Sequence, residues 1–538
     1  MTATQGGQEL AVRLLPVIPA EMVLPKPGPA EPAILESTER RLRASSYTIY
    51  VDLPNNSHEM LLVHGYTGAF DRVSGTVATY LRSLELKRPI RPLYGQWTPE
   101  PEIAPGTVAE PSAATIAVLK RRGYLTEMTL QEEEDRLAGI ATILHKQAST
   151  RPSYIFMPTY DCNLRCFYCF QDHMRTDPAF KHLLRTITVP MIDRIFEGIP
   201  KLEGLHGLAA GDVDRRSLGF FGGEPLLRQN RPAVEYIMRK AQALGPVSFW
   251  AVSNATDLDA YSELLGPGKI ARVQITLDGT PDEHDKRRIY ADGGGSYQRI
   301  ARNITMALEL GAAVDIRLNI DRNNIDTLPA LAQEMIAQGW PKYPNWSAYT
   351  APIHATNDKT ERKTTYTSWG LDKALEERRE LYPEMRVIDR PDDGLKDQAR
   401  SIFANEGLPN HRAQFCGANS SMYIFDAFGD LYACWERTGD QRIRIGNIEP
   451  DGEVNLSQFV LSAWRTRSVA NNSICRQCRY ALHCGGGCAV LAEGRRGSLS
   501  ANFCDGYAAR FRAMVAEAYL DHESGVAMNV REGRVCDL

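Results

Sequence analysis

The chain has 538 residues, of which 43% are hydrophobic and 24% are charged, and its formal net charge is −4. This length exceeds what a single hydrophobic core supports, so we expect about two to four domains. The weakly negative charge gives no basic surface for nucleic acid, and no apolar run of about eighteen residues occurs that would span a membrane. The N-terminus lacks the order of a signal peptide. We therefore expect a cytoplasmic protein whose eleven cysteines bind metal rather than form disulfides.

The N-terminal part of the chain predicts a flexible arm followed by a small domain. Residues 1–40 are rich in Pro, Ala and Glu and bury too little surface to become ordered. Residues 41–149 resemble a winged-helix module; the alternative is a structural cap. The expected elements are strands at 47–53 and 60–65 joined by the turn-forming PNNS, a helix near 74–85, a helix, a glycine break and a β-wing within 112–129, and the helix LQEEEDRLAGIATILHK.

From residue 154 onward, strands alternate with helical patterns. Repeated β–α units imply parallel pairing with right-handed crossovers, so residues 150–354 predict an α/β fold, a partial (β/α)6 TIM-like barrel. In such barrels the chemistry lies where the strands end. The expected strands are 154–159, 218–223, 247–254, 272–279, 314–320 and 346–353. A connector at 355–412, a cysteine-rich domain at 413–510 and a C-terminal helix and tail at 511–538 follow.

The segment TYDCNLRCFYCFQ, residues 159–171, carries three cysteines directly after the first of these strands, Cys162, Cys166 and Cys169. Thiolates at this spacing suit an iron–sulfur cluster, and a four-iron cluster ordinarily takes four of them. Three thiolates leave one iron open to another ligand, as an open position does in catalytic zinc sites. The alternative is a zinc site, although the second cysteine pair that such a site needs is not nearby.

CNLRCFYC resembles the CxxxCxxC signature of the radical S-adenosylmethionine (radical SAM) enzymes, and the resemblance extends from residue 150 to about 510. It implies that Cys162, Cys166 and Cys169 are metal ligands and catalytic residues of a [4Fe-4S] cluster whose open iron binds S-adenosylmethionine. One electron from the cluster then releases a 5′-deoxyadenosyl radical, which abstracts hydrogen from the substrate. The cofactor does the difficult chemistry, and the protein supplies position and exclusion.

Polar and glycine residues follow several of the other strands. Gly222 and Gly223 of FFGGEPLL allow the backbone to approach a ligand closely. Arg317 and Asn319 alternate on one strand, so they share a face, which we expect to be the barrel interior. Asp278 and His284 lie near the substrate by resemblance, without an assigned role. The resemblance implies cofactor contacts, to the methionine amino group, the ribose or the carboxylate, from Tyr168, Gly222, Gly223, Glu224, Ser253, Asn254, Arg317 and Asn319.

Seven further cysteines lie between residues 416 and 504, at spacings that match the SPASM extension of radical SAM enzymes. Zinc ribbons are the alternative, since CxxC pairs suit zinc as well as iron–sulfur clusters. The resemblance implies two auxiliary [4Fe-4S] clusters. Some relatives carry an extra cysteine where this chain has Met422, so the first auxiliary cluster lacks a fourth ligand unless water, substrate or Cys536 supplies it. The implied ligand sets are Cys416, Cys434 and Cys488 for that cluster and Cys475, Cys478, Cys484 and Cys504 for the other.

The resemblance extends to ribosomal peptide maturases. It implies an oxidoreductase that crosslinks or otherwise modifies a precursor peptide, with the leader added as a strand to an exposed edge of the N-terminal domain, at 47–53 or 60–70. Flavodoxin or ferredoxin is the expected electron donor. Sulfatase maturases carry an aspartate after the second extension cysteine, and here Trp435 and Glu436 follow Cys434, which disfavours formylglycine formation. The alternatives are a radical SAM dehydrogenase of a small molecule or protein side chain, and a non-catalytic zinc-binding interaction protein.

Overall fold

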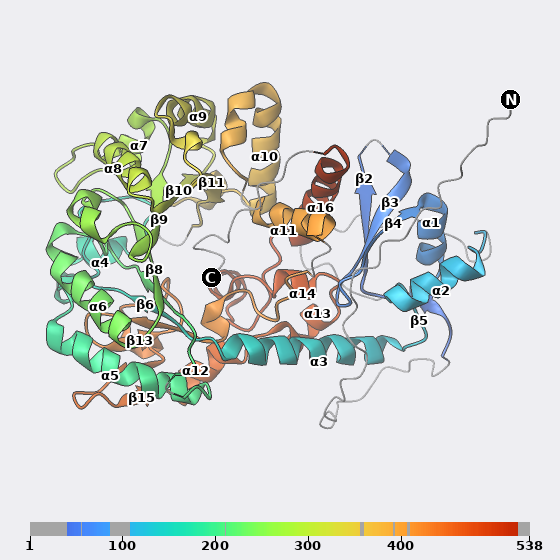
Figure 1. Cartoon of the computed structure of the whole chain (residues 1–538), viewed down its shortest axis with the longest axis horizontal. Helices are drawn as coiled ribbons and strands as arrows, with labels where there is room; N and C mark the ends of the chain where they lie inside the picture. The colour runs from blue at the N-terminus through green and yellow to red at the C-terminus, as the bar shows by residue number, and fades with distance from the viewer. Residues whose placement is uncertain are drawn as a thin grey trace.

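The computed structural model describes residues 40–54, 56–86, 108–209, 211–355, 360–390, 393–405 and 409–525. The flexible arm expected at the N-terminus, apart from its last residue, and Cys536 lie outside this part of the chain. Figure 1 shows the barrel at one end of the molecule and the N-terminal domain at the other, with the cysteine-rich region between them. Among the described residues, no helix has the length and apolar character needed to cross a bilayer.

Six parallel strands form the barrel wall, and the α/β fold predicted from the sequence is confirmed as a TIM-like partial barrel. The strands are almost wholly buried, as expected where helices cover a parallel sheet. All six strands expected from the sequence are present, within a few residues of the expected bounds. In spatial order they are β11 (Trp346–Pro352), β10 (Ala313–Ile320), β9 (Ile270–Leu277), β8 (Val247–Ser253), β7 (Arg216–Phe220) and β6 (Ser153–Phe156).

Amphipathic helices line the outside of the barrel (Figure 1). In α8 (Tyr297–Glu309), the residues Tyr297, Ile300, Ile304 and Leu308 recur at helical spacing and are buried, so one stripe of the helix packs on the strands. The other helices of this layer are α4 (Asp172–Thr176), α5 (Val189–Leu205), α6 (Arg231–Ala243), α7 (Pro281–Arg287) and α9 (Leu328–Ala337).

The cysteine-rich region continues the barrel sheet, which the sequence did not predict. The strand β12 (Met422–Phe425) pairs in parallel with β6, and three antiparallel strands follow it, so the sheet has ten strands. Three-residue strands between turns are too short to give an alternating pattern. The remaining elements are β13 (Asp430–Tyr432), β14 (Gly446–Ile448), β15 (Val454–Leu456), α12 (Gln458–Arg465), α13 (Ser473–Arg476), α14 (Ala481–Cys484), α15 (Ala489–Arg496) and α16 (Tyr507–Glu523).

The N-terminal domain is built on a three-stranded antiparallel sheet in the order β2-β3-β4. Its third strand was not expected, and Asn56 and Ser57 of the expected turn belong to the second strand. The wing is the pair β1–β5, and Gly123, with φ +92°, ends the helix before it. The elements are β1 (Arg43–Ala44), β2 (Thr48–Leu53), β3 (Asn56–His64), β4 (Phe70–Ser74), α1 (Gly75–Ser83), α2 (Ala113–Arg122), β5 (Leu125–Thr126) and α3 (Leu130–Ser149).

Both faces of this small sheet are buried. Tyr50 and Leu62 pack against α1, α2 and the wing, whereas Ile49 and Val51 on the opposite face pack against α11 (Asp393–Asn405) and α16. The stretch expected as a connector therefore contains ordered helices, α10 (Ser368–Leu381) and α11. It follows that helices more than 300 residues further along the chain cover one face of the N-terminal sheet.

The long helix α3 joins the N-terminal domain to the barrel and passes beside α13 and α14 (Figure 1). A capping box of Thr129 and Glu132 fixes its first turn. Leu137 and Ala141 in its middle pack with Val469 and Leu482 of the cysteine-rich region. The helix thus holds the three parts of the chain in contact.

Candidate active site

The loop with the first three cysteines leaves β6 at the carboxyl end of the barrel. Cys162 and Cys166 are buried around Leu164, and Cys169 packs against them, half-buried. Backbone hydrogen bonds hold the loop: Arg165 N lies 2.8 Å from Ile289 O, and Glu224 N lies 2.7 Å from the carbonyl of Asp161. The loop is therefore shaped by the fold around it, on the side facing β7 and on the side facing α7.

Burial makes these thiols costly to ionise on their own. It raises the pKa of Cys162 to about 11 and that of Cys166 to about 12, with Arg175 and Arg288, respectively, opposing the shift. Arg175 Nη2 lies 3.2 Å from Cys169 Sγ, and its Nε and Nη1 are buried with no partner among the described residues. A buried, unpaired guanidinium group needs an anion nearby. The loop thus fits a cluster held by thiolates.

The glycines after β7 serve a close approach between two loops. A Cβ at Gly223 would lie 2.2 Å from the carbonyl oxygen of Asp161, and Gly222 has φ +139°, so neither position admits a side chain. Substitution here would push β7 away from the cysteine loop. The predicted contact of these glycines with the methionine group stays a prediction.

Glu224 is buried, and its carboxylate accepts hydrogen bonds from inside the protein. The donors are Leu226 N at 2.9 Å, Ser253 Oγ at 2.7 Å and Asn254 N at 2.5 Å. Asn254 Nδ2 in turn lies 3.6 Å from Cys162 Sγ. The residues expected from the sequence at the ends of β7 and β8 are therefore brought together beside the cysteine loop, with Glu224 tying the two strand ends to each other.

A network of polar groups connects the cysteine loop to β9 and β10. The hydroxyl of Tyr168 lies 2.5 Å from Asp278 Oδ2, 2.6 Å from Arg288 Nη1 and 3.2 Å from Asn319 Nδ2. Arg317 Nε donates to Asn319 Oδ1 at 3.0 Å, so these alternate residues of β10 do share a face. That face is turned toward the cysteine loop.

For three residues of this site, the contribution to the site is visible only in the structure. Asp278 is fully buried and anchors Tyr168, although no role could be assigned to it from the sequence; Arg175 and Arg288 were not singled out. An arginine six residues after the third cysteine was the available sequence signal for Arg175. His284, by contrast, is buried away from the loop, with Nδ1 accepting from Asp278 N at 3.3 Å and Nε2 lying 3.0 Å from Ser296 Oγ. Its contacts are structural.

Comparison with known proteins identifies this part of the chain. Residues 156–335 match the family model described as the Radical SAM superfamily. These residues of the chain therefore form a radical SAM domain. A radical SAM domain implies S-adenosylmethionine and a [4Fe-4S] cluster, and such a cluster supplies the electron that generates a 5′-deoxyadenosyl radical.

The curated relatives with sequence similarity act on different substrates according to their names. The chain is 31% identical over 204 residues to a GTP 3′,8-cyclase of Rhodopirellula baltica, a match over 38% of this chain and 49% of that one. It is 21% identical over 383 residues to an Fe-coproporphyrin III synthase of Methanosarcina barkeri, over 67% and 88% of the two chains. The chain thus spans about half the length of the cyclases that it matches.

A solved structure shares the fold. The structure of native anSMEcpe with bound AdoMet matches with a TM-score of 0.51 and 15% sequence identity, over 69% of this chain and 99% of that one. The likeness supports the radical SAM barrel architecture. The cysteine-rich region of this radical SAM enzyme fits a SPASM extension by its spacing.

The cysteines of the SPASM region lie in two groups. The charges of Cys416 and Cys488 act on the Cys434 thiol, whereas Cys478, Cys484 and Cys504 act on Cys475, and burial is the main cause that raises the pKa of Cys434 and Cys475. These groups coincide with the two ligand sets expected from the resemblance; their role as cluster ligands stays a prediction. Among the described residues, no three His, Cys, Asp or Glu side chains converge as they would around a single metal ion.

Arg467 lies between the two groups. Its guanidinium group donates to the carbonyl oxygens of Leu499, Gly486 and Ala501 at 2.7, 3.1 and 2.9 Å, and the thiols of both groups act on its charge. A buried cation with only neutral hydrogen-bond partners fits a region that holds anionic clusters. Met422, at the position where some relatives carry a cysteine, is buried on β12 with its Cβ 3.1 Å from the Cβ position of Gly417.

The group of Cys416, Cys434 and Cys488 lies toward the mouth of the barrel. Trp435, which follows Cys434, stacks on Phe221 of the glycine loop, with ring centroids 5.4 Å apart and an interplanar angle of 29°. Burial raises the pKa of Glu436, and the charge of Arg317 on β10 opposes the shift. Trp435 is therefore a packing residue between the SPASM region and the barrel, and Glu436 lies on the side of the barrel residues.

The turn between β12 and β13 makes stability depend on pH. Burial, with the Asp430 carboxylate adding to it, raises the pKa of Asp426 from 3.8 to about 7. Asp426 Oδ2 accepts from Tyr160 Oη at 3.0 Å, and Oδ1 accepts from the main-chain N–H groups of Phe428 and Asp430. Because the folded state keeps this proton up to a higher pH than the unfolded state does, stability falls as pH rises from about 4 to about 7.

We expect Asp426→Asn to remove this dependence, because the amide keeps the oxygen that the two N–H groups need and does not titrate. The contribution of Asp426 to the slope is at most about 1.4 kcal/mol per pH unit. Anaerobic unfolding of both proteins between about pH 5.5 and about pH 8 measures it, and the wild type should lose stability relative to the variant as pH rises. Equal slopes would contradict this assignment.

Proposed function

We propose that this radical SAM enzyme modifies a ribosomally made precursor peptide, by hydrogen abstraction that leads to a crosslink or another side-chain or backbone change. The chemistry of the cofactor would take place at the loop of Cys162, Cys166 and Cys169. In this account Tyr168, Asp278 and Asn319 hold the loop against the barrel strands, and Trp435 closes the barrel mouth beside it. The SPASM region would hold two auxiliary [4Fe-4S] clusters, and a flavodoxin or ferredoxin would supply electrons in the cytoplasm.

The N-terminal sheet is the observation that carries the peptide assignment. Its two faces are covered, so a peptide reaches it at an outer strand, β2 or β4, where no further strand pairs with it in the described part of the chain. Strand addition at such an edge is a common way to bind an extended peptide. The sheet also lies against α16, which follows the last SPASM cysteine, so a leader bound here would lie beside the cysteine-rich region, which is between this domain and the barrel.

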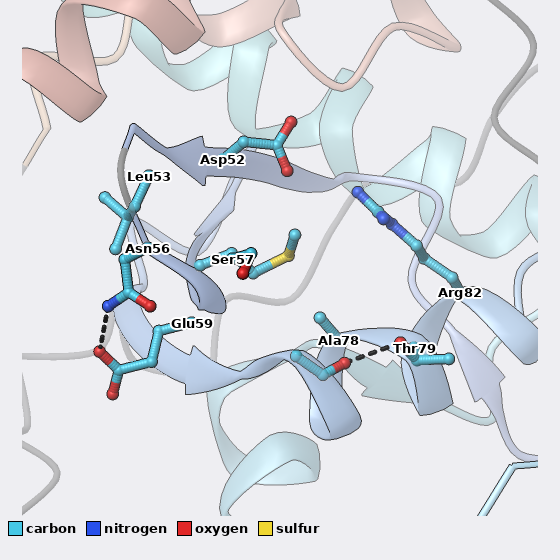
Figure 2. A pocket seen from close by; sticks show the side chains of 10 residues that line it. Asp52, Leu53, Asn56, Ser57, Glu59, Ala78, Thr79 and Arg82 are labelled. Carbon is cyan, nitrogen blue, oxygen red and sulfur yellow. Dashed lines mark hydrogen bonds between the residues drawn. The ribbon is translucent and has the colours of Figure 1, made fainter.

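A groove beside β2 supports this position (Figure 2). It has a volume of about 660 Å³ and lies between the β2–β3 hairpin and α1. Asp52 and Glu59 line one side and Arg82 the other, and the guanidinium group of Arg82 lies 4.8 Å from the centre of the Tyr50 ring. A groove lined by charges of both signs suits a polar, extended peptide segment.

The test is binding of a peptide to the full chain, with the peptide taken from a short reading frame beside the gene. Thr79→Trp on α1 fills the groove and should weaken binding about tenfold, which corresponds to about 1.4 kcal/mol. Arg121→Ala, an exposed change on α2, is the matched control and should bind as the wild type does. Fluorescence anisotropy gives both affinities. Equal binding by Thr79→Trp and the wild type would exclude the groove.

The auxiliary clusters have their own test. Anaerobically purified protein is expected to contain about a dozen iron atoms per chain, with sulfide and broad absorbance near about 400 nm. About four iron atoms per chain would contradict the auxiliary clusters. Zinc without sulfide would favour the zinc-binding interaction protein instead.

A second candidate is a small-molecule substrate, favoured by the names of the relatives, GTP 3′,8-cyclase and Fe-coproporphyrin III synthase. The N-terminal domain would then be a structural cap. Release of 5′-deoxyadenosine that GTP stimulates, and that the peptide does not, would favour this candidate.

A further inference from the structure

The buried arginine side chains of this protein have different partners for their positive charge, either a carboxylate or a cysteine sulfur. Several buried arginines pair with carboxylates at short range; examples are Arg43–Glu133, Arg122–Asp71 and Arg216–Glu203, each at 2.7 Å. Beside the first cysteine loop, Arg287 also pairs with a carboxylate, that of Asp321 at 2.9 Å, but Arg175 differs. Arg175 forms no ion pair with a carboxylate of the described residues, and its one hydrogen-bond partner there is the sulfur of Cys169.

Arg175 is placed by the chain itself rather than by an ion pair. It lies on the short helix α4, which begins three residues after Cys169, and Cys169 O accepts a hydrogen bond from Asp172 N at 3.1 Å. The remaining donors of Arg175, Nε and Nη1, have no partner among the described residues.

A fixed cation at this place distinguishes the two redox states of a cluster. Three thiolates give a four-iron cluster a net negative charge, and reduction by one electron makes that charge more negative. A nearby positive charge therefore stabilises the reduced state more than the oxidised state. Arg288 Nη1 lies 2.6 Å from the hydroxyl of Tyr168 in the same loop, so it adds a second cation there.

We propose that Arg175 is a positioning residue that raises the reduction potential of the cluster held by Cys162, Cys166 and Cys169. It acts through its charge and through its hydrogen bond to Cys169, without touching the substrate. The inference rests on the proposed ligand role of these three cysteines. No hydrogen or electron passes through Arg175; it only makes transfer of one electron from the donor to the cluster more favourable.

The test compares two substitutions in the intact, cluster-loaded enzyme. Arg175→Met removes the charge, Arg175→Lys keeps the charge, and Arg239→Met removes an equivalent charge on the exposed side of α6 as the control. A dithionite titration followed by electron paramagnetic resonance gives the midpoint potential of the one signal that changes when S-adenosylmethionine is added. We expect a lower potential for Arg175→Met, an intermediate or unchanged potential for Arg175→Lys, and the wild-type potential for Arg239→Met.

Each other outcome has a definite reading. An unchanged potential in Arg175→Met overturns the proposal, and so does an equal fall in Arg175→Met and Arg175→Lys, because the charge would then not matter. Weaker binding of S-adenosylmethionine at an unchanged potential would assign Arg175 to the cofactor instead. Loss of the responsive signal from Arg175→Met alone supports the proposal, and loss from both variants contradicts it. If the wild type itself gives no signal that responds to S-adenosylmethionine, the assignment of the three cysteines as cluster ligands fails. This outcome is distinct from a failure of the role proposed for Arg175.

Discussion

Cys166→Ala is expected to abolish release of 5′-deoxyadenosine. Cys166 is buried at the centre of the first cysteine loop, next to Cys162, and its loss leaves two thiols where the cluster needs three. Two ligands do not hold a four-iron cluster open to S-adenosylmethionine in a defined position. Anaerobic incubation with dithionite and S-adenosylmethionine, followed by chromatography of the nucleosides, measures the product.

The matched control is Cys484→Ala in the SPASM region. Each variant should lose about four iron atoms, but only Cys166→Ala should lose the spectral response to S-adenosylmethionine. Cys484→Ala should still cleave S-adenosylmethionine, because its cysteine loop is intact. Wild-type cleavage by Cys166→Ala would mean that this loop does not hold the reactive cluster.

Glu224→Ala is expected to destabilise the barrel by about 3 kcal/mol. Its carboxylate accepts hydrogen bonds from Leu226 N, Ser253 Oγ and Asn254 N, and alanine leaves these buried donors without an acceptor. The ends of β7 and β8 would then separate beside Cys162. Thermal unfolding of the anaerobic protein measures the stability, and the affinity for S-adenosylmethionine should fall together with it.

Glu224→Gln is the control for this prediction. Burial raises the pKa of Glu224 to about 7, so near neutral pH the wild-type side chain is partly protonated and the amide resembles that neutral form. We expect Glu224→Gln to lose less stability than Glu224→Ala. If both variants unfold as the wild type does, the hydrogen bonds of Glu224 are not important for the site.

The barrel could be predicted from the sequence because most of its strands are rich in apolar residues and alternate with helical patterns. QITL in β9 is an example, buried on both sides. The strands β4 and β12 could not, since FDRVS has a weak alternation and MYIF lies among the turns of the cysteine-rich region. Both strands form because a neighbouring strand is already in place: β4 pairs with β3, and β12 pairs with β6.

The residues of the candidate site also fall into those that the sequence predicts and those that only the structure shows. Cysteine spacing and the glycine loop are local patterns, so Cys162, Gly222 and their neighbours were found from the sequence. The partner of Tyr168 is Asp278, 110 residues further along the chain, and no local pattern connects them. Arg175 was missed for another reason. What sets it apart is that it pairs with a cysteine sulfur and with no carboxylate of the described residues, and only the packing in the structure shows this.

The sequence predicts a domain at residues 41–149, and the packing of this domain argues against using it alone. Ile49 and Val51 are buried against residues of α16, such as Val515, more than 400 residues away in sequence. An isolated fragment of residues 41–149 would expose this apolar face to water. Peptide binding is therefore best measured on the full chain.

In the proposed site, the first cysteine loop holds a cluster with one iron free to bind S-adenosylmethionine. The most direct measurement is electron paramagnetic resonance of the anaerobically reduced enzyme before and after S-adenosylmethionine is added. We expect the signal of one cluster to shift on addition of S-adenosylmethionine and this shift to be absent in Cys166→Ala. A spectrum that S-adenosylmethionine leaves unchanged in the iron-loaded wild type would contradict it.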